Sequence, residues 1–256
     1  MSKLTPSTAL EAQHELFAFT QSRAGLVFVS TLARISEAQA LPLQRQQAVV
    51  LRKGPTFFVT SDMLKLAQHA ADSMPLLPLK PQDLIAPDGV CIFEESLISP
   101  DLHNKDTSLV GFAWHPCLNQ DGTKGVLWTF ISDTHDPRDY YLNQKEALDI
   151  PGGCPRLLQL QFRFDPFGAD PCTIEEAAAA SAVSHEIARL SIASMRVMPL
   201  CLFVLMSQTI TETTTEKPKR HVRKRLARKK FPVSTIKVVR LRRITTKQGS
   251  DGESKE

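Results

Sequence analysis

Four runs of β-branched and aromatic residues in the middle of the chain constrain its fold more than any other feature. Turn-forming segments separate these runs, which span residues 89–98, 109–115, 125–132 and 156–164. In the last run, apolar and polar residues alternate from Leu158 to Phe164, as in a strand with one dry and one wet face. We therefore expect a mostly antiparallel central sheet.

Helical spacing of apolar residues precedes the strand runs. It predicts one or two helices between about residues 8 and 40. Thr8 and Glu11 have the spacing of a capping box, in which a hydroxyl and a carboxylate satisfy free backbone amides at a helix start. Residues 48–51 and 56–60 flank a Gly-Pro pair, and this pattern favours a short hairpin.

A second helical region follows the strand runs. Thr173 and Glu176 form another capping-box pair at its start, and Pro199 is expected to break or kink the helix. The apolar run over residues 197–206 is about half the length needed to span a bilayer, so it predicts a buried helix and no membrane contact. The expected fold is α+β, with N-terminal helices, a mostly antiparallel central sheet, a long C-terminal helix and a basic tail.

Charge is distributed very unevenly along the chain. Residues 217–247 contain fourteen Lys or Arg and no Asp or Glu, whereas residues 1–216 carry a net charge of −8. The composition predicts a globular domain over residues 1–208, a polar hinge over 209–216, a basic tail over 217–247 and a disordered C-terminus over 248–256.

A segment this basic predicts a polyanionic partner. We expect nucleic acid, DNA rather than RNA, or an acidic surface on another protein or on the chain's own acidic body. Because only one aromatic residue, Phe231, interrupts the bases, contact with the phosphate backbone is favoured over base reading. The candidate binding residues are Lys219, Arg220, Arg223, Lys224, Arg225, Arg228, Lys229, Lys230, Lys237, Arg240, Arg242 and Arg243.

One short motif suggests an enzyme. Ile131-Ser-Asp-Thr-His135 resembles the first metal-binding loop of calcineurin-type metallophosphoesterases, in which an Asp and a His at a strand end hold a metal. That resemblance implies metal-dependent phosphoester hydrolysis with Asp133, His135 and Asp139 as candidate residues. The later Gly-Asp, Gly-Asn-His and Gly-His-x-His loops of that family are absent from the sequence. A polar loop in which aspartates cap turns is the favoured interpretation, and no catalytic residue or cofactor is predicted.

Cysteine and histidine provide a second possible chemistry. His115 and Cys117 form one pair with metal-ligand spacing, and His135, Cys154 and Cys172 are possible further ligands. Structural zinc sites usually contain two such pairs, so a histidine and a cysteine at a strand end are favoured. The five scattered cysteines include no Cys-x-x-Cys pair, which is typical of thiols in the reducing cytoplasm.

The order of several short motifs resembles an uncharacterised family of actinobacterial, phage and plasmid proteins. The motifs are Pro87-Asp-Gly-Val90, Phe112-Ala-Trp114, Asp136-Pro-Arg-Asp139, Leu205-Met-Ser-Gln208 and the basic Ile236-Lys-Val-Val-Arg-Leu-Arg-Arg243. An Arg-, Trp- and His-rich segment follows in that family, so the resemblance implies a truncated or divergent member. It also implies a mobile-element setting and transfers no catalytic residue. The combined prediction is a non-enzymatic, nucleic-acid-associated accessory protein.

Overall fold

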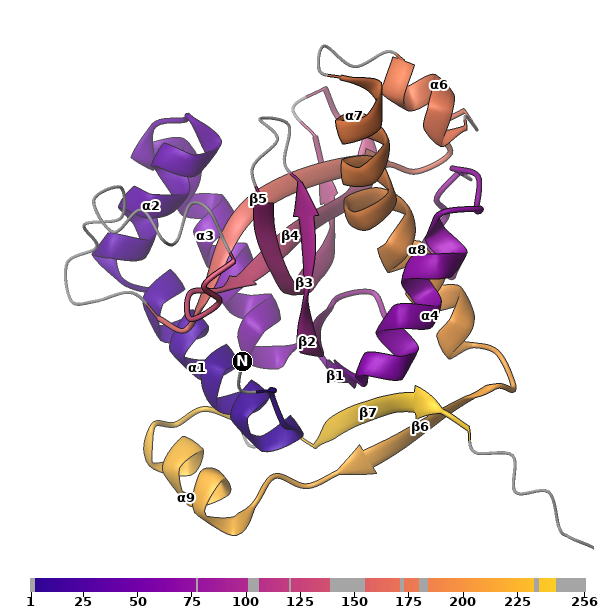
Figure 1. The fold of residues 1–256 in the computed structure, drawn as a ribbon. Coiled ribbons are helices and arrows are strands. Elements are labelled where there is room, and N and C mark those ends of the chain that lie inside the picture. Colours follow the sequence, from indigo (N-terminus) through magenta and orange to yellow (C-terminus); the bar gives the residue numbers. More distant parts are fainter. Residues whose placement is uncertain are drawn as a thin grey trace, which may run out of the picture.

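A single mixed β-sheet with helices on both faces organises the chain in the computed structural model (Figure 1). The structure describes residues 3–76, 78–100, 106–119, 121–138, 155–170, 173–179, 184–232 and 235–242. Within these residues seven strands follow the order β5-β4-β3-β2-β1-β7-β6. Helices together with a mixed sheet confirm the expected α+β class.

Four of the strands form the antiparallel half of this sheet. They are β2 (Gly89–Pro100), β3 (Asp106–Leu118), β4 (Lys124–Asp133) and β5 (Leu157–Pro166), each antiparallel to the next. These strands confirm the four runs predicted from the sequence. The expected wet face of the last strand is wrong at Gln159, which is only 3% exposed, whereas Arg163 is partly exposed.

Strand β1 (Thr56–Val59) corrects the predicted hairpin. Residues 48–51 belong to helix α3 (Glu37–Lys53), which ends at Gly54, and β1 is parallel to both of its neighbours. The continuous burial of β1 explains the difference, because a short apolar run without alternation is typical of a strand enclosed by parallel neighbours.

The C-terminal part of the chain corrects the predicted hinge and tail. Residues 209–216 contain the edge strand β6 (Thr211–Glu216), and residues 217–247 contain helix α9 (Arg220–Arg228) and strand β7 (Ile236–Leu241). Strand β7 lies between β1 and β6, parallel to β1 and antiparallel to β6. The threonine run suits a strand better than a hinge, because β-branched residues favour extended backbone. Residues 248–256 lie outside the described part of the chain.

Helices α1 (Pro6–Thr20), α2 (Arg23–Ala33) and α3 lie on one side of the sheet (Figure 1). They begin earlier and are more numerous than predicted. Thr5, not Thr8, is the N-cap of α1; the Thr8 hydroxyl accepts a hydrogen bond from the backbone amide of Thr5, the part expected of Glu11. Buried side chains of α1 and α3 form a core with one face of β1, β2, β3 and β7.

The opposite face is covered by α4 (Ser61–Ala71) and by one long helical segment from His185 to Met206. This segment consists of α7 (His185–Ile192), a π-helical turn (Ala193–Val197) and α8 (Met198–Met206). The helix does not break at Pro199, but an irregular π-helical turn lies directly before Met198, where the sequence predicted a break or a kink. The Thr173–Glu176 capping pair is confirmed, but it opens the separate short helix α6 (Ile174–Ala179).

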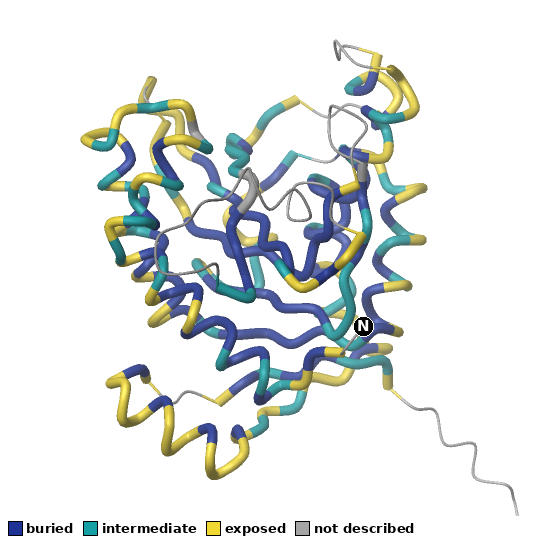
Figure 2. The backbone as a smooth tube through the Cα atoms, turned by 60° about the vertical axis from the view of Figure 1, so that its left-hand side comes forward, coloured by how far each residue is buried: buried dark blue, intermediate teal, exposed yellow. Residues whose placement is uncertain are grey.

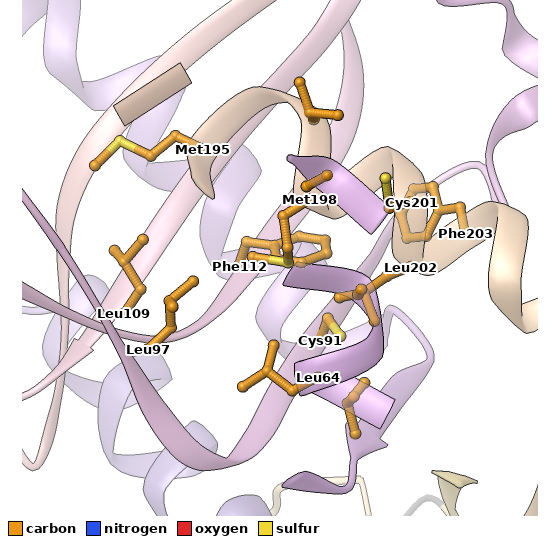
Figure 3. Close-up of a cluster of buried hydrophobic side chains, with 14 of the residues drawn as sticks. Leu64, Cys91, Leu97, Leu109, Phe112, Met195, Met198, Cys201, Leu202 and Phe203 are labelled. Atoms are coloured by element: carbon orange, nitrogen blue, oxygen red, sulfur yellow. The ribbon is translucent and has the colours of Figure 1, made fainter. Parts of the chain in front are cut away.

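This long segment is apolar and long enough to cross a bilayer, but more than half of its most apolar window is buried inside the protein. The ring of Phe203 lies 4.9 Å from that of Trp114, and it also contacts Phe112 in the core shown in Figure 3. The segment is therefore a core helix, as the sequence predicted for residues 197–206, and this favours a soluble protein.

Candidate nucleic-acid interface

Helix α9 is attached to the body by a narrow apolar stripe. Val222 and Leu226, one turn apart, are its two buried residues. Phe231 lies three residues after the end of the helix, and its buried ring contacts the rings of His14 and Phe17 on α1, with centroids 5.1 and 5.4 Å apart. These contacts fix which side of α9 faces the protein.

Polar contacts hold both ends of α9. At its start, the backbone amide of Lys219 donates a hydrogen bond of 3.1 Å to the Ser7 hydroxyl. Past its end, Nη2 of Arg52 on α3 donates a 3.3 Å hydrogen bond to the carbonyl of Lys230. The Arg52 guanidinium also lies over the Phe17 ring at 5.8 Å. The helix is thus fastened to both α1 and α3.

Most of the predicted basic residues in this segment point toward solvent. Figure 2 shows α9 as a largely exposed helix, and its two buried residues are Val222 and Leu226. Within the described residues one α9 cation, Arg225, forms an ion pair, and its partner is Glu11 on α1. The exposed cations of this segment without a carboxylate partner among the described residues are Lys219, Arg220, Arg223, Lys224, Arg228, Lys229 and Lys230.

Lys237 and Arg240, the predicted residues on β7, contact side chains of the sheet. The ammonium group of Lys237 lies 4.9 Å from the centre of the Phe57 ring. Arg240 is half-buried and donates hydrogen bonds of 2.7 and 2.9 Å to Thr214 and Glu216 of the edge strand. Both side chains therefore contribute to the sheet. Arg242 is exposed, and Arg243 lies outside the described residues.

Arg52 is part of this surface, although no pattern in the sequence selects it. A lone Arg-Lys pair at the end of a helix is common, because basic residues there interact favourably with the helix dipole. Its position beside Lys230 becomes visible once the fold brings α3 and α9 together. The pKa of His14 is lowered, mainly by burial and to a smaller extent by the positive charge of Lys229.

The loop that resembles a metallophosphoesterase motif uses its first aspartate for contacts within the protein. Asp133 accepts hydrogen bonds from the Arg156 guanidinium at 2.9 Å and from the backbone amide of His135 at 3.0 Å. His135 itself is exposed, and Asp139 lies outside the described residues. The aspartate therefore caps a turn and holds an arginine, which is the favoured interpretation from the sequence.

Asp136, the next carboxylate in this loop, is also engaged. It accepts hydrogen bonds from Arg138 and from the Ser108 hydroxyl. Burial alone would raise the pKa of Asp136, but the hydrogen bonds from Arg138 outweigh it and lower this pKa to about 2. Among the described residues no three His, Cys, Asp or Glu side chains are grouped in a way that could hold a metal ion.

A pocket of about 180 Å³ lies beside this loop. Its charged groups are already paired with protein groups: Glu94 accepts from the backbone amide and hydroxyl of Ser61, and Lys3 forms an ion pair with Glu95. The lining residues are Lys3, Leu4, Glu94, Glu95, Ser96, Val110, Asp133 and Arg138. The pocket thus combines paired charges of both signs and favours neither an anion nor a cation.

The two residues of the possible metal pair on β3 differ in burial, since His115 is buried and Cys117 is partly exposed. His115 is 3% exposed, and burial lowers its pKa to about 4, so the imidazole is neutral at physiological pH. Burial also raises the pKa of the Cys117 thiol, which opposes formation of the thiolate that binds metal. Cys154 and Cys172 lie outside the described residues.

No family model, curated protein or solved structure matches the chain. Chemistry must therefore be judged from the surface itself. The α9 surface offers positive charge and hydrogen-bond donors held on and beside a helix, a chemistry that suits an anionic ligand.

Proposed function

We propose that the protein is a non-enzymatic accessory protein that binds the phosphate backbone of nucleic acid, DNA in preference to RNA, through the surface of α9. The observation that carries this proposal is the set of seven exposed cations, four on α9 and three directly beside its ends, on a helix whose apolar stripe fixes its orientation. A bacterial mobile element or phage and the cytoplasm are the proposed setting, on the strength of the family resemblance and the scattered cysteines.

Binding of this kind depends strongly on salt, because each neutralised phosphate releases condensed counterions. If about six phosphates are contacted, affinity for duplex DNA should fall by roughly 10³ or more between 50 and 200 mM salt. A weak salt dependence would be inconsistent with a phosphate-binding surface.

The direct test neutralises the surface within the full chain. Glutamine replaces all seven exposed cations, from Lys219 to Lys230, and DNA binding is measured by fluorescence anisotropy at 50 mM salt. We expect binding to be lost while the melting temperature stays close to that of the wild type, because none of these side chains is buried. The matched control is Lys237→Gln, which changes a cation of the same segment outside the surface.

Retained DNA binding by the seven-fold variant would overturn the proposal. The same surface would also suit an acidic protein partner, which the sequence left open. That function predicts no binding of wild-type protein to DNA even at low salt, so the same titration distinguishes the two.

A further inference from the structure

Three of the exposed cations on α9 form a single row along the helix. Arg220, Lys224 and Arg228 are spaced four residues apart, and all three are exposed. At 3.6 residues per turn, Lys224 lies almost opposite the midpoint between Val222 and Leu226, which are the buried residues. The row therefore points directly away from the protein body.

We propose that this row docks along one strand of double-stranded DNA, with each side chain on a successive phosphate. The inference rests on the proposed function and adds the form of the nucleic acid and the residues that determine it. With a rise of 1.5 Å per residue, the three side chains start about 6 Å apart along the helix axis. That interval is comparable to the distance between neighbouring phosphates of one strand, and flexible Arg and Lys side chains absorb the remaining mismatch.

The attachment of α9 makes this row a fixed feature. A nine-residue helix is too short to be stable alone, so its direction depends on the body that holds it. The contacts from Ser7 to the Lys219 amide and from Arg52 to the Lys230 carbonyl restrain its two ends. Because the row is held before DNA arrives, less conformational entropy is lost on binding.

Double-stranded DNA fits this surface better than a single strand. Proteins that hold single strands stack the bases on exposed aromatic rings. The phenyl rings of Phe17 and Phe231 next to α9 are buried against each other, and Phe231 also contacts His14. On α9 itself the one aromatic side chain is the exposed imidazole of His221, a smaller stacking surface than a phenyl or indole ring. An exposed helix with cations is suited to the regular phosphates of a duplex instead, and contacts of this kind do not read sequence.

The experiment compares two triple variants that remove equal charge from the full chain. One removes the row, as Arg220→Gln, Lys224→Gln and Arg228→Gln. The other removes three exposed cations outside it, as Arg223→Gln, Lys229→Gln and Lys230→Gln. Affinity for a 20-base-pair duplex of arbitrary sequence is measured by anisotropy across a range of salt, and thermal unfolding verifies that both variants are folded.

We expect the row variant to bind more than about 100-fold more weakly at 100 mM salt, and its salt slope to fall by nearly 3, which corresponds to three lost phosphate contacts. The off-row variant should lose less than a third of that slope. Equal losses in the two variants would overturn the row but leave the proposed function intact. Unchanged binding in both would overturn the proposed function as well.

A second arm tests the form of the nucleic acid. Wild-type protein is titrated with the duplex, with each of its single strands and with an RNA duplex of the same sequence. Tighter binding to the DNA duplex than to the other two supports the inference. Equal or tighter binding to a single strand would overturn docking on a duplex, and a preference for the RNA duplex would overturn the choice of DNA.

Discussion

The carboxylate of Glu11 on α1 forms an ion pair with the guanidinium of Arg225 on α9. Glu11 is the one acidic partner of an α9 cation within the described residues. The pair lies at the side of the helix, between the buried stripe and the outward row. It therefore helps to set the rotation of α9 and also neutralises one charge of the surface.

Replacing Glu11 with Gln should strengthen DNA binding. The change removes a negative charge beside the surface and releases Arg225 for phosphate, so the salt slope should rise by up to about 0.9. Stability should change by less than about 1 kcal/mol, because Arg225 is largely exposed. Anisotropy titrations of both proteins across salt measure the slope. Glu15→Gln on the same helix is the control, and an effect equal to that of Glu11→Gln would show that only net charge matters.

Leu226→Ala should destabilise the protein. Leu226 is 2% exposed, and removing a buried leucine side chain typically costs about 2–5 kcal/mol, the low end being expected for a site near the surface. DNA affinity should fall as well, although no cation is changed, because α9 loses half of its apolar stripe. Urea unfolding and anisotropy give the two values. Arg228→Ala, at an exposed position, should leave the free energy of unfolding within about 0.5 kcal/mol of the wild type. An equal loss of stability in Leu226→Ala and Arg228→Ala would contradict the packing of α9.

Stability should decrease below about pH 6.5 because of His115. Its pKa is lowered by burial from 6.5 to about 4, so protonation favours the unfolded chain. The stabilising effect of the lowered His115 pKa is complete above pH 6.5. As the pH falls toward 4, the free energy of unfolding decreases by up to about 3 kcal/mol. Urea unfolding at a series of pH values measures this change. His115→Gln should remove most of it, whereas a His14 variant should remove less, and an unaltered pH profile in His115→Gln would contradict the assignment.

Asp133→Asn should affect stability rather than a metal-dependent activity. The substitution weakens the ion pair between Asp133 and Arg156, whose side chains are both largely buried. The free energy of unfolding should fall by about 1–3 kcal/mol. Addition of Mn²⁺ or Zn²⁺ should leave the melting temperature of wild type and variant unchanged. A metal-induced rise in the wild type that Asp133→Asn abolishes would instead support the phosphoesterase hypothesis.

The sequence predicted the antiparallel half of the sheet well, because strands from Gly89 to Pro166 carry local patterns and are joined in chain order. It failed where partners are distant in sequence. Strand β1 pairs with residues 236–239, and nothing local to Thr56 indicates such a partner. Ile236 and Val239 could be recognised as part of a short extended segment, but the surrounding basic residues favour a solvated tail over a strand inside a sheet.

The candidate site also combines residues that local sequence can identify with residues that only the fold identifies. The cations of α9 could be recognised from composition alone, since their role needs only exposure and charge. Separating them from Lys237 and Arg240 required the fold, because both kinds of residue have the same local chemistry. Arg52 could not be found in the sequence, since its role depends on the packing of α3 beside the end of α9.

Ending the chain at Glu216 should unfold the protein instead of producing a stable body without a tail. Such a truncation removes β7, whose Ile236 and Val239 are fully buried, and leaves β1 and β6 without the strand that joins them. An exposed apolar edge at β1 would then favour aggregation. Size-exclusion chromatography and thermal unfolding measure the outcome, with the full-length seven-fold glutamine variant as the folded control. A truncated chain that stays monomeric and unfolds cooperatively near the wild-type temperature would mean that β7 adds little to the core, and that the basic segment is detachable after all.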